Sequence, residues 1–242
     1  MVVAFKTNDT NVLQLHKFCL YRSLQMSVNL IRVIGISLLL IFIYIGISLH
    51  TAFTAPLVVT EYLFSEQGAY EVFSPLLWFV LAVLCLVNLK LQFSTRILTA
   101  LAALMLGLRE MDLHKSLFEM SFIKTNFYKS SDIASTDKLL GFTLLMVMIY
   151  ILAALAKRFY KVLRNIKQDL DISYIYVVFT IGIAALSKVL DRMTSQLNEL
   201  FDIQLIRSTQ LAIMTAEESF EMLLPVLLIV AVLSYRNFKF EK

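Results

Sequence analysis

The chain has 242 residues, of which 59% are hydrophobic and only 17% are charged, and its mean hydropathy is +0.75. A soluble domain has about 45–50% apolar and about 25% charged residues, so this sequence lacks the polar side chains to cover a water-soluble globule. Its composition also excludes an intrinsically disordered chain, and its 2 cysteines exclude a secreted disulfide scaffold. With 6 Gly and 3 Pro, it has too few turn residues for a barrel of many short strands. The sequence predicts an all-α, multi-pass membrane protein.

Six apolar stretches approach the roughly 20 residues that a helix needs to cross the bilayer. They cover residues 30–48, 72–87, 97 to about 113, 139–156, 172 to about 190, and about 220–235. Charged residues intrude at the ends of the third and sixth stretches. Within 191–218, apolar residues at mixed helical spacing predict an additional helix that lies in the outer membrane interface.

The predicted organisation is one membrane domain over residues 1–242. It consists of a cytoplasmic or interfacial N-terminal segment over 1–29, a six-helix bundle over 30–235 and a short tail over 236–242. With both termini on one side, that side holds 14 of the 22 bases and 4 of the 18 acids, a net charge of +10. The other side carries −6, which completes the overall +4. Because Lys and Arg concentrate in cytoplasmic loops, both termini are expected in the cytoplasm of a bacterial inner-membrane or plasma-membrane protein.

Several common functions have no support in the sequence. The glycine-rich fingerprints of dinucleotide and phosphate binding are absent, as are HExxH, CxxC and GxSxG. We therefore expect no nucleotide cofactor. The basic run KRFYKVLRNIK follows the topology rule and gives no further reason to expect nucleic-acid binding. Membrane lipids are the expected partners, and the sequence identifies no protein partner.

Ionisable residues recur at one depth of the predicted bundle. At about 1.5 Å per residue from the nearest cytoplasmic anchor, four predicted helices place charged groups roughly 20–30 Å across the membrane. These residues are Glu71, Arg109, Glu110, Asp112, His114, Lys188, Asp191, Glu217, Glu218 and Glu221. Charges inside a membrane span are costly, so they mark a functional site by default. The coincidence predicts a polar pocket in the outer third of the bilayer, between the second, third, fifth and sixth helices.

The spacing of these residues within each helix supports a shared pocket. Glu110 and His114 are four residues apart, and Lys188 and Asp191 are three apart, so each pair lies on one helical face. Acids outnumber bases at this depth, even when Arg192 is counted with the bases. Carboxylates that crowd together in a low dielectric must bind either protons or a cation. A purely structural network would tend towards balanced charge.

The acid surplus predicts a divalent metal site. Candidate ligands are Glu71, Glu110, His114 and Glu221, a mixed nitrogen and oxygen set that suits zinc, manganese or iron. A set of oxygen ligands alone would suit calcium, the less favoured ion. A bound metal would promote ionisation of a water molecule, which a nearby carboxylate could deprotonate.

This chemistry suggests a metal-assisted membrane hydrolase or a related lipid-modifying enzyme. Its substrate would be a lipid or a lipid-linked headgroup that reaches the pocket from the outer leaflet. Asp112 or Glu218 would act as the base, while Arg109 and Lys188 would hold a phosphate or a developing oxyanion.

Two other classes of function stay open at this point. The charged groups could form a structural ion-pair network in a membrane sensor or assembly subunit. Alternatively, they could line the vestibule of a proton- or cation-coupled transporter. Transporters usually contain interrupted helices, and Gly107, Gly182 and Pro225 are the interruptions considered within the predicted spans.

Overall fold

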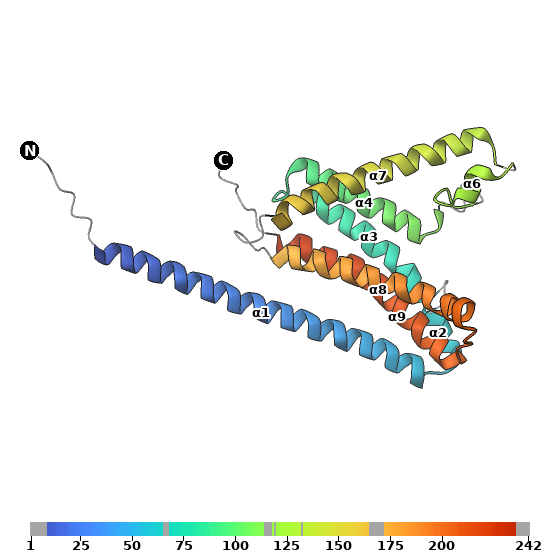
Figure 1. The fold of residues 1–242 in the computed structure, drawn as a ribbon, viewed down its shortest axis with the longest axis horizontal. Helices are drawn as coiled ribbons and strands as arrows, with labels where there is room; N and C mark the ends of the chain where they lie inside the picture. The colour runs from blue at the N-terminus through green and yellow to red at the C-terminus, as the bar shows by residue number, and fades with distance from the viewer. Residues whose placement is uncertain are drawn as a thin grey trace, which may run out of the picture. The chain divides into compact units, whose positions relative to one another are not determined.

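The computed structural model describes residues 9–64, 68–113, 118, 120–131, 133–164 and 172–235. Every regular element in these residues is a helix, and none is a strand. The helices are α1 (Asp9–Thr54), α2 (Leu57–Phe64), α3 (Ala69–Val87), α4 (Phe93–Glu110), α6 (Thr125–Lys129), α7 (Ser135–Arg164), α8 (Ile172–Phe201) and α9 (Arg207–Ser234). The all-α prediction is therefore confirmed for the described residues (Figure 1).

Four segments of the described chain are long and apolar enough to cross a membrane. They are Ile31–Thr54, Val58–Val87, Ser135–Lys161 and Ile172–Phe201. By their length and composition, these apolar helices are compatible with a multi-pass membrane protein. The α4 and α9 helices lie at the third and sixth predicted spans, but Arg109 and Glu110 end α4, and acids interrupt α9. The count of six spans and the orientation of the termini stay predictions.

Two compact units make up the chain, Met1–Tyr44 and Ile45–Lys242. The division falls inside α1, which continues without a break from Asp9 to Thr54. No helix end therefore marks the boundary predicted at residue 30. The predicted tail over 236–242 lies outside the described residues.

The second unit is built around α9. This helix packs against α8 and α3, α3 also packs against α4, and α4 contacts α7 (Figure 1). Between Leu211 and Val232, no α9 side chain is fully exposed, which makes α9 an interior helix. Its apolar residues Leu224 and Leu228 contact the buried cluster of α3 and α4 around Trp78 and Leu81.

Small residues let the helices of this unit approach closely. A Cβ at Gly107 of α4 would lie 3.0 Å from the Cβ of Trp78 and 3.1 Å from Cε1 of Phe79, both on α3. Buried hydroxyl residues line the faces of α8 and α9, among them Ser187, Thr215 and Ser219. Membrane helices commonly associate through such small side chains, because apolar side chains gain little by leaving lipid.

An aromatic cluster covers one end of α7. Phe127 of α6 is fully buried, and its ring meets Phe118 and Tyr128 edge to face with centroids 5.8 and 5.0 Å apart. A Cβ at Gly141 would come within 2.9 Å of the Phe127 ring and 3.0 Å of the Phe122 Cβ. The absence of a side chain at Gly141 thus allows the short α6 segment to lie directly on α7.

The separate interfacial helix predicted within 191–218 is wrong. Residues 191–201 instead continue α8 to Phe201, and α9 already begins at Arg207. Asp202, at the break, has a φ of 53°, in the left-handed region that ends helices. The physical reason is that residues 189–201 contain no Gly or Pro and include the good helix formers Arg192, Gln196 and Glu199, so leaving the apolar region did not end the helix.

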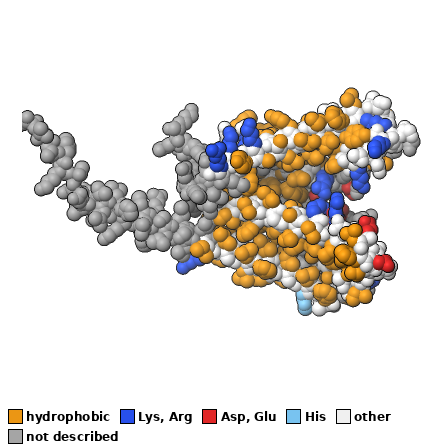
Figure 2. All heavy atoms as spheres, in the orientation of Figure 1, with side chains coloured by type: hydrophobic (Ala, Val, Ile, Leu, Met, Phe, Trp, Pro, Cys, Tyr) orange, Lys and Arg blue, Asp and Glu red, His pale blue; other side chains and the backbone are white. Residues whose placement is uncertain are grey.

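Hydrophobic side chains cover much of the described surface in Figure 2, with Lys, Arg, Asp and Glu gathered towards its ends. At one end of the second unit, the Arg158 guanidinium of α7 donates to the Ser94 and Thr95 hydroxyls at the start of α4. Towards the right of the figure, basic and acidic side chains meet in a hollow of the surface. An apolar surface with charges at its ends suits a protein surrounded by lipid.

Candidate functional site

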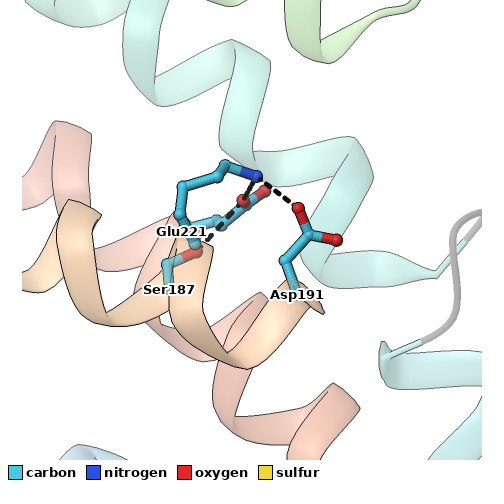
Figure 3. Close-up of polar contacts among 4 residues, drawn as sticks. Ser187, Asp191 and Glu221 are labelled. Atoms are coloured by element: carbon cyan, nitrogen blue, oxygen red, sulfur yellow. Dashed lines mark hydrogen bonds and ion pairs between the residues drawn. The ribbon is translucent and has the colours of Figure 1, made fainter. Parts of the chain in front are cut away.

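The centre of the candidate site is an ion pair between α8 and α9. The Lys188 Nζ donates to Glu221 Oε1 and to Asp191 Oδ2, each at 3.1 Å (Figure 3). Asp191 lies one turn after Lys188 on the same helix, whereas Glu221 comes from the neighbouring helix. The Lys188 and Asp191 side chains are about half exposed, while that of Glu221 is only 21% exposed. Lys188 thus links an accessible acid to a more enclosed one.

Ser187 provides a second contact to the same glutamate. Its hydroxyl donates to Glu221 Oε1 at 3.1 Å, and the residue is 1% exposed (Figure 3). The sequence analysis missed Ser187, because a lone serine in an apolar helix gives no signal of its own. Its position directly before Lys188 was the available clue, since both side chains reach α9 from α8.

Further carboxylates surround this pair. The charges of Glu221, Arg109, Lys188 and Glu71 all act on Glu110 of α4. The charges of Glu221, Glu217, Glu71 and Glu110 act on Glu218 of α9. Lys188, Asp191 and Glu221 are in direct contact, and charged residues of α3, α4 and α9 act electrostatically on the same region; we call this set the acidic cluster. Its members are Glu71, Arg109, Glu110, Lys188, Asp191, Glu217, Glu218 and Glu221.

Two predicted site residues are not placed in this cluster. Asp112 lies in the turn after α4 with a φ of 50°, and its participation stays a prediction. His114 lies outside the described residues. In the part of the chain that the structure describes, no group of three or more His, Cys, Asp or Glu side chains has metal-binding geometry. Glu71, Glu110 and Glu221 alone therefore do not form a ready ligand cage.

Acids outnumber bases in the acidic cluster, as they do in the sequence. Lys188 already contacts two of the acids, and Arg109, an exposed residue, is the other base among the members. Partial burial makes the mutual repulsion of Glu110, Glu218 and Glu221 stronger than it would be in water. Protons or cations that neutralise them would stabilise the arrangement.

The same short motif occurs in two packed helices of the cluster. In α3, Glu71 begins EVFSP, and in α9, Glu221 begins EMLLP, so each glutamate precedes a proline by four residues. Both Pro75 and Pro225 are buried inside their helices. The sequence analysis weighed Pro225 only as an interruption and missed this repeated spacing, although it is visible in the sequence.

The position of each proline affects the backbone of a cluster residue. In an α-helix, the N–H of a residue donates to the carbonyl oxygen four residues earlier, and proline has no N–H. Pro225 therefore cannot donate to the Glu221 carbonyl, and Pro75 cannot donate to that of Glu71. At Glu221, a backbone carbonyl without its helix hydrogen bond lies on the same residue as a cluster carboxylate. Interrupted membrane helices use such carbonyls as ligands for cations.

Comparisons with known proteins do not add to this description. No protein-family model, no curated protein and no solved structure matches the chain.

Proposed function

We propose that this membrane protein binds a hard cation at Glu221, through its carboxylate and its backbone carbonyl, and that other carboxylates of the acidic cluster move in to complete the ligand set only when the ion binds. The observation that carries the proposal is at Glu221, whose carboxylate lies at the contact between α8 and α9 and whose carbonyl receives no helix hydrogen bond from Pro225. Hard divalent ions prefer oxygen ligands, and calcium tolerates irregular sets of carboxylates and carbonyls. Calcium and manganese are therefore the first candidates, whereas zinc or iron would need an imidazole such as that of His114.

Lys188 has a defined part in this proposal. Its ammonium group and the cation would compete for Glu221, so binding of the cation would release Lys188 towards Asp191 or solvent. Both side chains of the Lys188–Asp191 pair are accessible enough for this movement. The half-exposed Lys188 ammonium keeps its contact with Asp191 when it leaves Glu221, and the cation takes its place beside the more enclosed Glu221 carboxylate.

Thermal unfolding of the purified protein in detergent tests the proposal. Calcium or manganese should raise the melting temperature, and a chelator should reverse the rise. Glu218→Gln should weaken this effect, whereas Glu199→Gln on the exposed end of α8 should leave it unchanged. Equal responses of both variants, or no response of the unaltered protein to either ion, would show that the cluster does not bind these cations.

A hydrolase and a transporter, two different classes of function, would use the cation differently. In the hydrolase proposed from the sequence, the ion would assist attack of water on a lipid or lipid-linked substrate. In a cation-coupled transporter, the ion would move with or against a solute. The prolines inside α3 and α9 favour the second class, because transport sites often lie at interrupted helices. Ion-dependent uptake into proteoliposomes would support transport, and release of a lipid product would support hydrolysis.

A structural role is a further candidate, favoured by one observation. Lys188 and Ser187 both connect α8 to Glu221 of α9 and thereby hold the two helices together. A sensor or assembly subunit would need this connection but no cation. In that case, substitutions at Glu110 and Glu218 would change stability in proportion to the lost contacts, and no cation would alter the melting temperature.

A further inference from the structure

A second polar site lies outside the acidic cluster, where α2 contacts the beginning of α9. A pocket of about 630 Å³ opens there. Its lining consists of Glu61, Tyr62, Arg207, Gln210, Leu211 and Met214. None of these residues belongs to the acidic cluster, so this site does not depend on the proposed cation.

The pocket holds one positive and one negative side chain in contact. The Arg207 guanidinium donates through Nη2 to Glu61 Oε1. Both side chains are substantially exposed, at 71% for Arg207 and 45% for Glu61. A guanidinium has five N–H donors and a carboxylate has two acceptor oxygens, so each group keeps capacity for another partner. An incoming ligand can therefore bind both residues without separating them.

The remaining lining residues divide into polar and apolar parts. The Gln210 amide donates from Nε2 to the Leu205 carbonyl at 3.0 Å, which fixes its orientation and leaves its Oε1 as an acceptor. Leu211 and Met214 add apolar walls on the same helix. Val58 of α2 and Ile206, the residue before α9, are 76% and 72% exposed, so both chain segments that form the pocket also carry exposed apolar side chains.

We propose that this pocket binds a zwitterion that joins a phosphate to a primary amine, the headgroup chemistry of phosphatidylethanolamine. The phosphate oxygens accept from Arg207, because guanidinium groups bind phosphate through paired donors. The ammonium group donates to Glu61 and to Gln210 Oε1. The four charges then alternate in sign around the pocket, and an acyl chain follows Leu211 and Met214 towards the exposed apolar surface.

Charge and donor count explain the expected selectivity. The Arg207 and Glu61 pair is neutral overall, so an anionic headgroup would meet the Glu61 carboxylate without compensation. A quaternary choline headgroup has no N–H to donate to Glu61. Phosphatidylethanolamine should therefore bind more tightly than phosphatidylcholine, and both should bind more tightly than phosphatidylglycerol.

Calorimetric titration of the full-length protein in detergent tests this proposal. The probes are the short-chain dioctanoyl forms of the three lipids and free phosphoethanolamine. Arg207→Gln should weaken binding of the ethanolamine lipid by roughly tenfold, because a charge-assisted phosphate contact is lost. Glu61→Gln should weaken it to the level of the choline lipid while leaving choline-lipid binding nearly unchanged. Lys124→Gln, at an exposed position near α6, is the matched control.

Each outcome of the titration decides the proposal. Tighter binding of the lipid than of free phosphoethanolamine identifies a membrane lipid as the ligand, and equal binding identifies a soluble phosphoamine in the same site. Equal affinity for all three lipids, or the same loss in Lys124→Gln as in Arg207→Gln, overturns it. Arg207 and Glu61 are exposed, so substitutions there should leave the protein folded. The variant Arg207→Lys keeps the positive charge, and its affinity for the ethanolamine lipid should lie between those of the unaltered protein and Arg207→Gln.

Discussion

Lys188 of α8 and Glu221 of α9 are joined across the helix interface, with Nζ and Oε1 3.1 Å apart. The contact connects helices whose sequence positions are separated by the turn at Asp202. The charge of Lys188 also acts on Glu110 of α4. If the proposed cation binds at Glu221, stability and cation binding both depend on Lys188, and they should respond to its substitution in opposite directions.

Replacing Lys188 by methionine should destabilise the protein but strengthen cation binding. Removal of the ammonium leaves Glu221 facing Glu110 and Glu218, and the pair is partly exposed, so the expected loss of unfolding free energy is about 1 kcal/mol. The double variant Lys188→Met with Glu221→Gln should recover part of this loss. Chemical denaturation in detergent measures the stability of both variants and of the unaltered protein. The variant Lys188→Met should bind calcium and manganese more tightly than the unaltered protein. Equal or weaker binding would show that the Lys188 ammonium and the cation do not compete for the Glu221 carboxylate.

Pro225→Ala should stabilise α9 and weaken cation binding. Alanine restores the N–H that donates to the Glu221 carbonyl, and a proline inside a helix costs up to about 3 kcal/mol relative to alanine. The new hydrogen bond withdraws one oxygen ligand from the cation. Melting temperature and cation affinity should therefore change in opposite directions. Pro56→Ala, at the exposed break between α1 and α2, is the control and should change neither by a comparable amount.

Gly107→Ala should destabilise the contact between α3 and α4. Its Cβ would meet Trp78 at 3.0 Å and Phe79 at 3.1 Å, and overpacking of this kind costs about 1–3 kcal/mol. Trp78 is the single tryptophan of the chain, so its fluorescence reports directly on this interface. Gly182→Ala is the matched control, because no atom lies within 4 Å of its Cβ position. That control should raise stability by about 0.5–1 kcal/mol through the better helix propensity of alanine.

Gly141→Ala should release the α6 segment from α7. The added methyl would lie 2.9 Å from the Phe127 ring, and a fully buried phenylalanine has no room to move aside. Lys124 and Lys129 flank that ring in sequence and are exposed, so trypsin should cut at them faster in the variant. Mass spectrometry of the fragments identifies the cleavage sites. Unchanged cleavage at both lysines would show that the aromatic cluster tolerates the methyl group.

The predicted orientation can be tested by adding one cysteine at a time to a Cys19→Ser variant, which keeps only Cys85. Cys85 is fully buried and should not react with a membrane-impermeant maleimide in intact cells. Lys124→Cys should be labelled from outside, and Arg164→Cys should be labelled only after the membrane is permeabilised. The opposite pattern would reverse the assignment of the basic loops to the cytoplasm.

The helices were the most predictable part of the structure. Each of the six apolar stretches lies within or largely within a long helix, because sustained apolar sequence both forms helices and requires burial or lipid. Their ends were less predictable. The α8 helix passes its apolar region and reaches Phe201, since residues such as Gln196, Leu197 and Glu199 have good helix propensity whatever their depth.

The composition of the acidic cluster was partly predictable. The estimated depth of each residue in the membrane was enough to predict Glu71, Glu110, Lys188 and Glu221 as members. Charged residues at the same depth on packed helices lie close together. The pairing of Lys188 with Glu221 was not predictable, since it depends on which face of α9 meets α8. Ser187 was missed for the same reason, as its role exists only through that contact.

Paramagnetic resonance of manganese tests the central claim most directly, because free Mn²⁺ gives a sharp signal that binding broadens. Titration of the purified protein should show one saturable site that calcium displaces and that Glu218→Gln weakens, with Glu199→Gln as the control. The contradicting result is a free-manganese signal that rises in proportion to the manganese added, from the first addition onward, and that is identical with and without the protein. It would show that the carboxylates of α3, α4 and α9 do not hold the cation.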